Sequence, residues 1–156
     1  LEFRRVLFRS ERSDLPLYHS DVKAYEVLDE HSGKLMAYFY ADFFPRSSKR
    51  GGAWMTNFLE QGTWSGRVMR PHVSIVCNFT KPTASQPSLL THGEVKTLFH
   101  EFGHALHSIL SECTYASVSG TNVYWDFVEL PSQVMENWAY EAEGLGLFAQ
   151  IGRAHV

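Results

Sequence analysis

Long apolar runs, a surplus of basic residues and a cysteine framework are all missing from this sequence of 156 residues. No run approaches the roughly 20 apolar residues that a membrane-spanning helix needs, so no membrane segment is expected. Lys and Arg together number 14 against 17 Asp and Glu, which excludes a basic nucleic-acid-binding surface. Cys77 and Cys113 are too few for a disulfide scaffold and favour a reducing, cytoplasmic compartment. Repeats are absent, and the length allows one domain.

Both ends of the chain read as translated sequencing adapter. Residues 151–156 back-translate to ATC GGA AGA GCA CAC GTC, whose reverse complement encodes, in a shifted frame, the same five amino acids as residues 5–9 and ends on a nucleotide that can begin the codon of Ser10. We therefore exclude residues 1–10 and 151–156 from the fold prediction. Residues 11–150 are expected to be an internal part of a longer protein, and a signal peptide upstream of them stays an open alternative.

The first half of the retained chain predicts β-structure. Residues 21–29 and 34–44 are rich in Tyr, Phe and Val, and the link Glu30-His31-Ser32-Gly33 has the composition of a turn, which together indicate a β-hairpin. The second of these strands is apolar on both faces, so we expect it to be central or covered. A third strand is predicted over residues 73–80, where alternate positions are apolar: Val73, Ile75, Cys77 and Phe79.

Two segments between these strands have weaker patterns. Residues 45–53 form a polar loop, interpreted either as a solvated turn or as a contact for an anion or substrate. Residues 54–70 have no clean period and are predicted to be a mixture of loop and short helix.

A helix is predicted from Thr91 to about Ser111. Thr91 and Glu94 have the spacing of a capping box, in which each side chain accepts a backbone N–H of the other. Gly103 is unfavourable inside a helix, so it indicates a close neighbour, either a metal or substrate backbone or a crossing helix. The buried face is predicted from apolar residues at three-and-four spacing: Val95, Leu98, Phe99, Phe102, Leu106, Ile109 and Leu110.

This helix carries the motif His100-Glu101-Phe102-Gly103-His104. Residues four apart lie about 40° apart in projection and one turn along a helix, so both imidazoles can reach one ion. Glu101 can then act as general base toward a water activated by the metal. The alternative is a chance occurrence of a short pattern on a packed helix. His107 lies roughly 10 Å along the axis from His100, too far to share that ion, and is expected near the site or in solvent.

A second helix is predicted from Asp126 to about Glu143. Asp126 and Glu129 have capping-box spacing, and Pro131 fits a first turn. If this helix runs antiparallel to the first, Glu129 is the natural third metal ligand, although an acidic residue near a helix start is commonly a partner of the helix dipole.

Seven short blocks occur in one order along the chain. The upstream blocks are Tyr-Glu-Val, Lys-Arg-Gly-Gly-Ala-Trp and Thr-His-Gly-Glu-Val-Lys-Thr-Leu-Phe. The downstream blocks are His-Glu-Phe-Gly-His-Ala-Leu-His, Val-Ser-Gly-Thr, Asp-Phe-Val-Glu-Leu-Pro-Ser-Gln and Glu-Asn-Trp. Together they resemble the thimet oligopeptidase and peptidyl-dipeptidase family of zinc metallopeptidases, and the resemblance covers nearly all of residues 21–143.

The resemblance implies one Zn²⁺ per chain, held by His100, His104 and Glu129, with Glu101 as catalytic base. It implies hydrolysis of short peptides, of peptidyl-dipeptidase or oligoendopeptidase type, by a protein that is monomeric when full length. The expected fold is an α+β fragment of a predominantly α-helical zincin, with the hairpin and third strand followed by the active-site helix and the second, ligand-bearing helix. Residues 11–150 would then be a partial metallopeptidase catalytic domain.

Further candidate site residues are predicted from their positions relative to Glu129 and from the family's substrate loop. Asp126 and Glu136 flank Glu129 at helical spacing and are candidates for the second coordination shell, where a carboxylate accepts the other N–H of a ligating histidine. Gly120 and Thr121 resemble the loop over the family's substrate cleft. The tyrosine and histidine segment with which the family steadies the oxyanion is absent here. A zinc-binding but catalytically incompetent module is therefore one alternative, and a helical fragment with an accidental motif is another.

Overall fold

The structure, a computed structural model, describes residues 6–146, so the predicted adapter at residues 151–156 lies outside the described part. Its centre is a five-stranded sheet of order β1-β2-β3-β7-β4. The sheet consists of β1 (Val6–Glu11), β2 (Lys23–Asp29), β3 (Leu35–Asp42), β4 (Trp54–Leu59) and β7 (His72–Val76).

The predicted hairpin is confirmed. β2 and β3 pair antiparallel, with Tyr25 opposite Phe39, and the turn between them closes through a hydrogen bond from Asp29 N–H to the Lys34 carbonyl. β3 is the middle strand of the sheet, as its apolar character on both faces predicted. The prediction that residues 1–10 are adapter stays untested, although the backbone of β1 adds a strand beside β2 in this region.

The predicted third strand is β7, which is shorter than expected. It runs parallel to β3, with Phe39 opposite Val73. The alternating side chains predicted to share one face do so, because all of them join the core on the side of the sheet that faces the first long helix. This core contains Val27, Ala37, Phe39, Ala41, Val73, Ile75, Cys77, Phe79, Ala105 and Ile109.

The prediction of loop and short helix for residues 54–70 is wrong. β4 pairs antiparallel with β7 at the edge of the sheet, and β5 (Gly62–Trp64) and β6 (Arg67–Met69) form a separate two-stranded hairpin. Five of the six residues of β4 are half-buried, so both of its faces are partly covered and no alternation of polar and apolar residues appears in its sequence. β5 and β6 are only three residues each, too short for a period.

The loop at residues 45–53 is not a solvated turn throughout. The Lys49 side chain is only 2% exposed, and its Nζ lies 2.9 Å from Oδ1 of buried Asp42. Nζ also donates to the backbone carbonyls of Asp42, Phe44 and Cys77. A buried ammonium is tolerated when it is paired and hydrogen-bonded in this way. Lys49 therefore joins the loop to the ends of β3 and β7.

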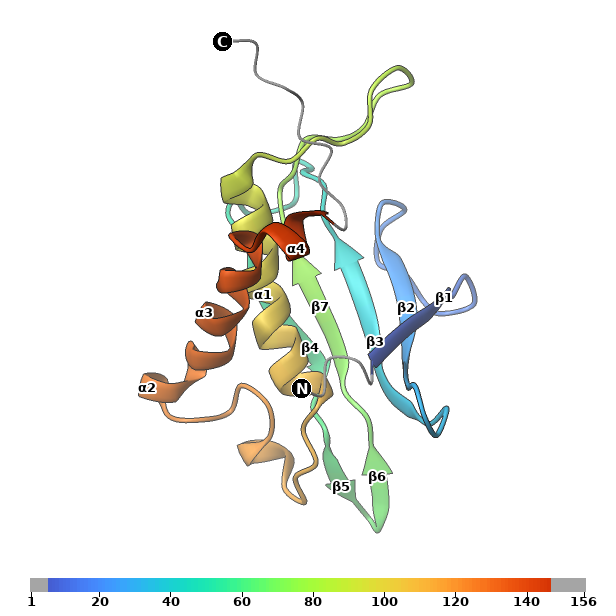
Figure 1. The fold of residues 1–156 in the computed structure, drawn as a ribbon. Helices are drawn as coiled ribbons and strands as arrows, with labels where there is room; N and C mark the ends of the chain where they lie inside the picture. The colour runs from blue at the N-terminus through green and yellow to red at the C-terminus, as the bar shows by residue number, and fades with distance from the viewer. Residues whose placement is uncertain (1–5, 147–156) are drawn as a thin grey trace.

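The first predicted helix is α1 (His92–Ile109), and its capping box is confirmed. Thr91 is the N-cap: its hydroxyl accepts the N–H of Glu94, and the Glu94 carboxylate accepts the N–H of Thr91. Figure 1 shows α1 lying against β4 and β7, while α2 (Trp125–Val128) and α3 (Leu130–Glu136) lie on the far side of α1 from the sheet. Within residues 6–146, none of the helices combines the length and apolarity required to cross a membrane.

The second helix is broken, which corrects the prediction of one helix from 126 to 143. The chain forms α2 (Trp125–Val128), α3 (Leu130–Glu136), the 3-10 helix η3 (Asn137–Ala139) and α4 (Ala142–Gly146), after a short 3-10 turn η2 (Ala116–Val118). The predicted capping box of Asp126 and Glu129 is also wrong, since α2 starts after Tyr124, which makes no side-chain cap. Glu129 instead lies at the junction between α2 and α3, and Pro131 lies in the first turn of α3 as expected.

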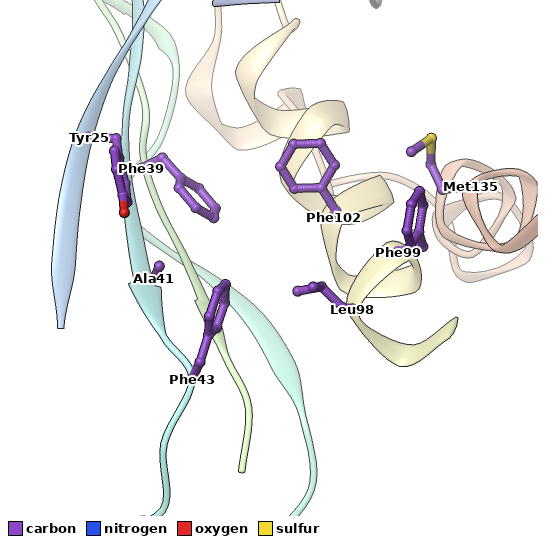
Figure 2. Close-up of a pocket in the computed structure, with 8 residues that line it drawn as sticks. All are labelled: Tyr25, Phe39, Ala41, Phe43, Leu98, Phe99, Phe102 and Met135. Atoms are coloured by element: carbon purple, nitrogen blue, oxygen red, sulfur yellow. The ribbon is translucent and has the colours of Figure 1, made fainter. Parts of the chain in front are cut away.

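An apolar cavity of about 410 Å³ separates α1 from part of the sheet. Figure 2 shows aromatic side chains of the two layers facing one another across this space, with Phe39 and Phe43 on the sheet side and Phe102 on α1. The contact between Phe39 and Phe102 is edge-to-face, with ring centroids 6.1 Å apart. The two layers are therefore joined at this point and leave unfilled apolar space beside it.

Candidate metal centre

The three predicted metal ligands lie close together in the structure. The two imidazole Nε2 atoms of His100 and His104 each lie 3.2 Å from Oε2 of Glu129. The imidazole rings are 5.0 Å apart between centroids and nearly perpendicular. Within the described residues these three side chains form a group whose ligand atoms all lie within 4.8 Å of one another. Local helix geometry brings the two histidines together, whereas Glu129 comes from the junction of two other helices.

The spacing of these atoms fits a tetrahedral ion. With zinc–ligand bonds of about 2.0–2.1 Å, neighbouring ligand atoms of a tetrahedron are about 3.3 Å apart, close to the two nitrogen–oxygen distances of 3.2 Å. Two imidazoles and one carboxylate also match the donor set of catalytic zinc sites, which keep a fourth position open. The residues present therefore fit a bound zinc ion.

The surroundings of His104 favour the neutral form of its imidazole. Its burial lowers the pKa of the imidazole, against a smaller opposing effect of the Glu129 charge. A metal ligand must offer an unprotonated nitrogen, so a lowered pKa favours binding. The other ring nitrogen, Nδ1, is buried and has no hydrogen-bond partner within the described residues.

His107, expected near the site or in solvent, lies outside the ligand group. Its ring packs against Phe127, with centroids 6.0 Å apart, and burial lowers the pKa of its imidazole.

Glu101 is buried beside the ligands. The residue is only 8% exposed, and burial raises the pKa of its carboxyl group. The negative charge of Glu129 raises this pKa further, while the His100 charge and a backbone hydrogen bond with Met55 of β4 lower it. A carboxyl group with a raised pKa is a stronger base once ionised, which suits proton transfer at neutral pH.

The candidate Glu136 lies against His100. Its Oε1 is 2.7 Å from His100 Nδ1, and its Oε2 is 2.9 Å from the ammonium of Lys96. The hydrogen bond from Lys96 is the main cause that lowers the pKa of Glu136, so the carboxylate stays ionised. An acceptor at Nδ1 fixes the proton on that nitrogen and leaves Nε2 free for a metal.

Asp126, the other candidate for the second shell, is exposed in the first turn of α2. Neither a hydrogen bond nor an ion pair joins it to His100 or His104 in the part of the chain that the structure describes.

The candidate substrate-loop residues are Gly120 and Thr121, and Gly120 packs against the C-terminal end of α1. Gly120 is buried and has φ +54°, and a Cβ at this position would lie 2.7 Å from the Ser108 hydroxyl. Its N–H donates to the Ser111 hydroxyl at 2.7 Å. The loop is therefore anchored on α1 at this point, and half-buried Thr121 follows it. Their assignment to a substrate loop stays a prediction.

Gly103 explains how the third ligand reaches the site. A Cβ at Gly103 would lie 2.5 Å from Cα of Ser132 and 2.6 Å from the carbonyl oxygen of Pro131. Of the two neighbours predicted for this glycine, the structure therefore has the crossing helix. Figure 1 shows α3 running antiparallel beside α1, and this close approach places Glu129 over the two histidines.

Gly103→Ala is expected to destabilise the protein by about 1–3 kcal/mol, because the added methyl group meets backbone atoms that cannot rotate away. The matched control is Gly93→Ala on the same helix, where a Cβ meets nothing within 4 Å. The control should stabilise by up to roughly 1 kcal/mol through helix propensity. Denaturant unfolding of both variants measures the difference, and equal stability would contradict the close contact.

Two contacts of the site were not predicted from sequence. Lys96 pairs with Glu136, and the hydroxyl of Ser132 lies 2.7 Å from Glu129 Oε2. The available signal was helical spacing, since Lys96 precedes His100 by four residues and Ser132 follows Glu129 by three.

Comparison with known proteins shows the family to which this chain belongs. Residues 6–152 match Peptidase family M3, and the chain belongs to this family. It is 50% identical to dipeptidyl carboxypeptidase of Escherichia coli K12 over 143 residues, which cover 92% of this chain and 20% of that protein. It is 46% identical to oligopeptidase A of the same organism over 141 residues, 89% of this chain and 21% of that protein.

A eukaryotic relative is similarly close. The chain is 42% identical to thimet-like oligopeptidase of Dictyostelium discoideum over 138 residues, 85% of this chain and 20% of that protein. The chain thus spans about a fifth of the length of the curated relatives that it matches. The family resemblance drawn from the motifs is confirmed.

Proposed function

We propose that the protein of which this chain forms part is a zinc-dependent peptidase that hydrolyses short oligopeptides. The observation that carries this proposal is the convergence of the His100, His104 and Glu129 ligand atoms within 4.8 Å, beside buried Glu101. Membership of Peptidase family M3 supports the reaction class. The relatives' names support both a dipeptidyl carboxypeptidase and an oligopeptidase mode of action.

The roles of the residues follow from their chemistry. A zinc ion bound here would act as a Lewis acid: it would polarise the peptide carbonyl and lower the pKa of a bound water toward about 7. The Nε2 atoms of His100 and His104 and Oε2 of Glu129 would hold this ion. The Glu101 carboxylate accepts the proton of the attacking water and then donates it to the leaving amine. Glu136 holds the proton of His100 on Nδ1.

A second candidate function is zinc binding without turnover by this segment alone. It is favoured by the small share of the relatives' length that the chain spans. The expected cytoplasmic location and monomeric state of the full-length protein remain predictions.

His104→Ala in the full-length protein is expected to remove most of the bound zinc, because it deletes one of three ligands and leaves an incomplete site. Elemental analysis of purified protein measures the zinc content. The matched control is His107→Ala, which removes a neighbouring half-buried histidine of the same helix that lies outside the ligand group. Equal zinc content in wild type and His104→Ala would contradict the ligand assignment, and loss of zinc in both variants would indicate a general structural effect.

A further inference from the structure

The side chain of Ser132 lies against the third ligand. Ser132 is fully buried, at 0% exposure, and its Oγ is 2.7 Å from Glu129 Oε2. This is the same carboxylate oxygen that faces Nε2 of both His100 and His104. A hydroxyl group is thus placed on the oxygen that would bind the ion, from the side of α3 rather than from the side of α1.

The hydroxyl has one proton and two nearby acceptors. Besides Oε2, the backbone carbonyl of Glu129 lies 2.9 Å from Ser132 Oγ. That carbonyl already accepts the N–H of Gln133 at 2.9 Å. A charged carboxylate is also the stronger acceptor, and hydrogen bonds to charged groups are shorter and stronger than those to neutral ones. Both the shorter distance and the charge therefore direct the Ser132 proton to Glu129 Oε2.

The position of this hydroxyl is set by backbone rather than by a flexible side chain. Ser132 Cα packs directly against Gly103 of α1, because a Cβ at position 103 would lie only 2.5 Å from Ser132 Cα. Ser132 has only one rotatable bond before its hydroxyl, whereas Glu129 has three before its carboxylate and its side chain is 42% exposed. Without a fixed donor, the Glu129 carboxylate would be free to turn into solvent.

We propose that Ser132 is a positioning residue that holds the Glu129 carboxylate over His100 and His104 and thereby strengthens metal binding. The inference rests on the metal site proposed above and adds a residue to it. Groups that orient metal ligands typically contribute a factor of about 10–100 to metal affinity. Because Ser132 acts through Glu129, its effect should disappear when the Glu129 carboxylate is removed.

The test is Ser132→Ala in the full-length protein, with Zn²⁺ affinity measured by competition with a chromophoric chelator. Alanine keeps the backbone contact of residue 132 with Gly103 and removes only the hydroxyl. The dissociation constant for Zn²⁺ is expected to rise about 10-fold or more. The matched control is Ser108→Ala, which removes another buried serine hydroxyl, one bonded to Asn57 instead of a ligand. The control should leave the Zn²⁺ affinity unchanged.

A double-mutant cycle separates positioning from a general structural effect. In a Glu129→Ala background the two histidines still bind Zn²⁺ weakly, and Ser132→Ala should cause no further loss there. The absorption spectrum of bound Co²⁺ should also change in Ser132→Ala and stay unchanged in Ser108→Ala. Ser132→Ala could lower the unfolding temperature of the metal-free protein more than the control does. The double-mutant cycle then still shows whether the loss of Zn²⁺ affinity depends on Glu129.

The outcomes distinguish this inference from the proposed function. Wild-type protein that binds no Zn²⁺ would overturn the metal site itself. Wild-type binding with an unchanged affinity in Ser132→Ala would overturn the role of Ser132 and leave the metal site standing. A loss that is equally large in the Glu129→Ala background would likewise overturn it, because Ser132 would then act without Glu129.

Discussion

Glu101→Gln in the full-length protein is expected to lower kcat for peptide hydrolysis by about two to four orders of magnitude while zinc stays bound. Glutamine has nearly the shape of glutamate, so the buried position at 8% exposure accepts it without a change in packing. The three predicted ligands are untouched. The amide cannot accept the proton of the attacking water, and this loss alone causes the effect. Turnover of a quenched fluorescent peptide and elemental analysis measure the two quantities on the same sample.

A suitable control for this variant is Glu112→Gln, the same chemical change at an exposed position just after α1. It should retain the activity of the wild type. Near-normal hydrolysis by Glu101→Gln would remove Glu101 from the mechanism, even if the metal site is correct. Loss of zinc from Glu101→Gln would instead show that the residue supports the ligands, and the activity loss could then not be assigned to the base.

Residues 11–150 expressed alone are expected to bind zinc but to hydrolyse peptides at least about 10²–10³-fold more slowly than a full-length relative. The motif resemblance places the groups that steady the oxyanion on a tyrosine and histidine segment outside these residues, and loss of one such donor typically has an effect of this size. Poorer positioning of the peptide adds to the deficit. The measurement is turnover of one short quenched peptide by both proteins, each loaded with zinc.

The isolated segment should also associate with itself. Tyr124 and Trp125 are 89% and 87% exposed, and the apolar cavity beside Phe39 and Phe102 is not filled (Figure 2). Large exposed apolar surfaces of this kind favour aggregation. Size-exclusion chromatography before the assay therefore serves as the control, so that slow turnover is measured on monomeric protein. Turnover comparable to that of the full-length relative would show that the remaining four-fifths of such a protein is dispensable for catalysis.

Local sequence was sufficient for two contacts within single turns of α1 and for the tight turn between β2 and β3. The capping box of Thr91 and Glu94 involves residues three apart, and the shared face of His100 and His104 involves residues four apart. Backbone geometry alone determines these contacts, so the start of α1 and the shared face of His100 and His104 could be predicted. Glu129 was predicted from an assumed antiparallel second helix and from its family motif, and its place beside the histidines depends on how α3 packs on α1.

Predictions failed where neighbours distant in sequence decide the structure. β4 is half-buried on both faces because β7 pairs with it and α1 covers it, so its own residues show no strand period. The break of the second helix at Glu129 has a local signal in Pro131, which fits a first helical turn or a kink, but the sequence alone did not show that a new helix starts there. The break turns the chain so that α3 can run along α1, and the contact of Gly103 with the backbone of Ser132 fixes that approach.

The sequence by itself determined the chemistry of this protein: two imidazoles on one helical face, a carboxylate between them in the chain, and the motifs of a peptidase family. Only the tertiary structure decided how the predicted ligand set is brought together. Glu129, at the start of α3, contacts both His100 and His104. Glu136 contacts His100 and Ser132 contacts Glu129, both from α3, which begins more than twenty residues after α1 ends. Their contacts depend on the distance between two helix backbones, which Gly103 makes short. That distance depends on how α1 and α3 pack together, and the spacing of residues within either helix does not specify it.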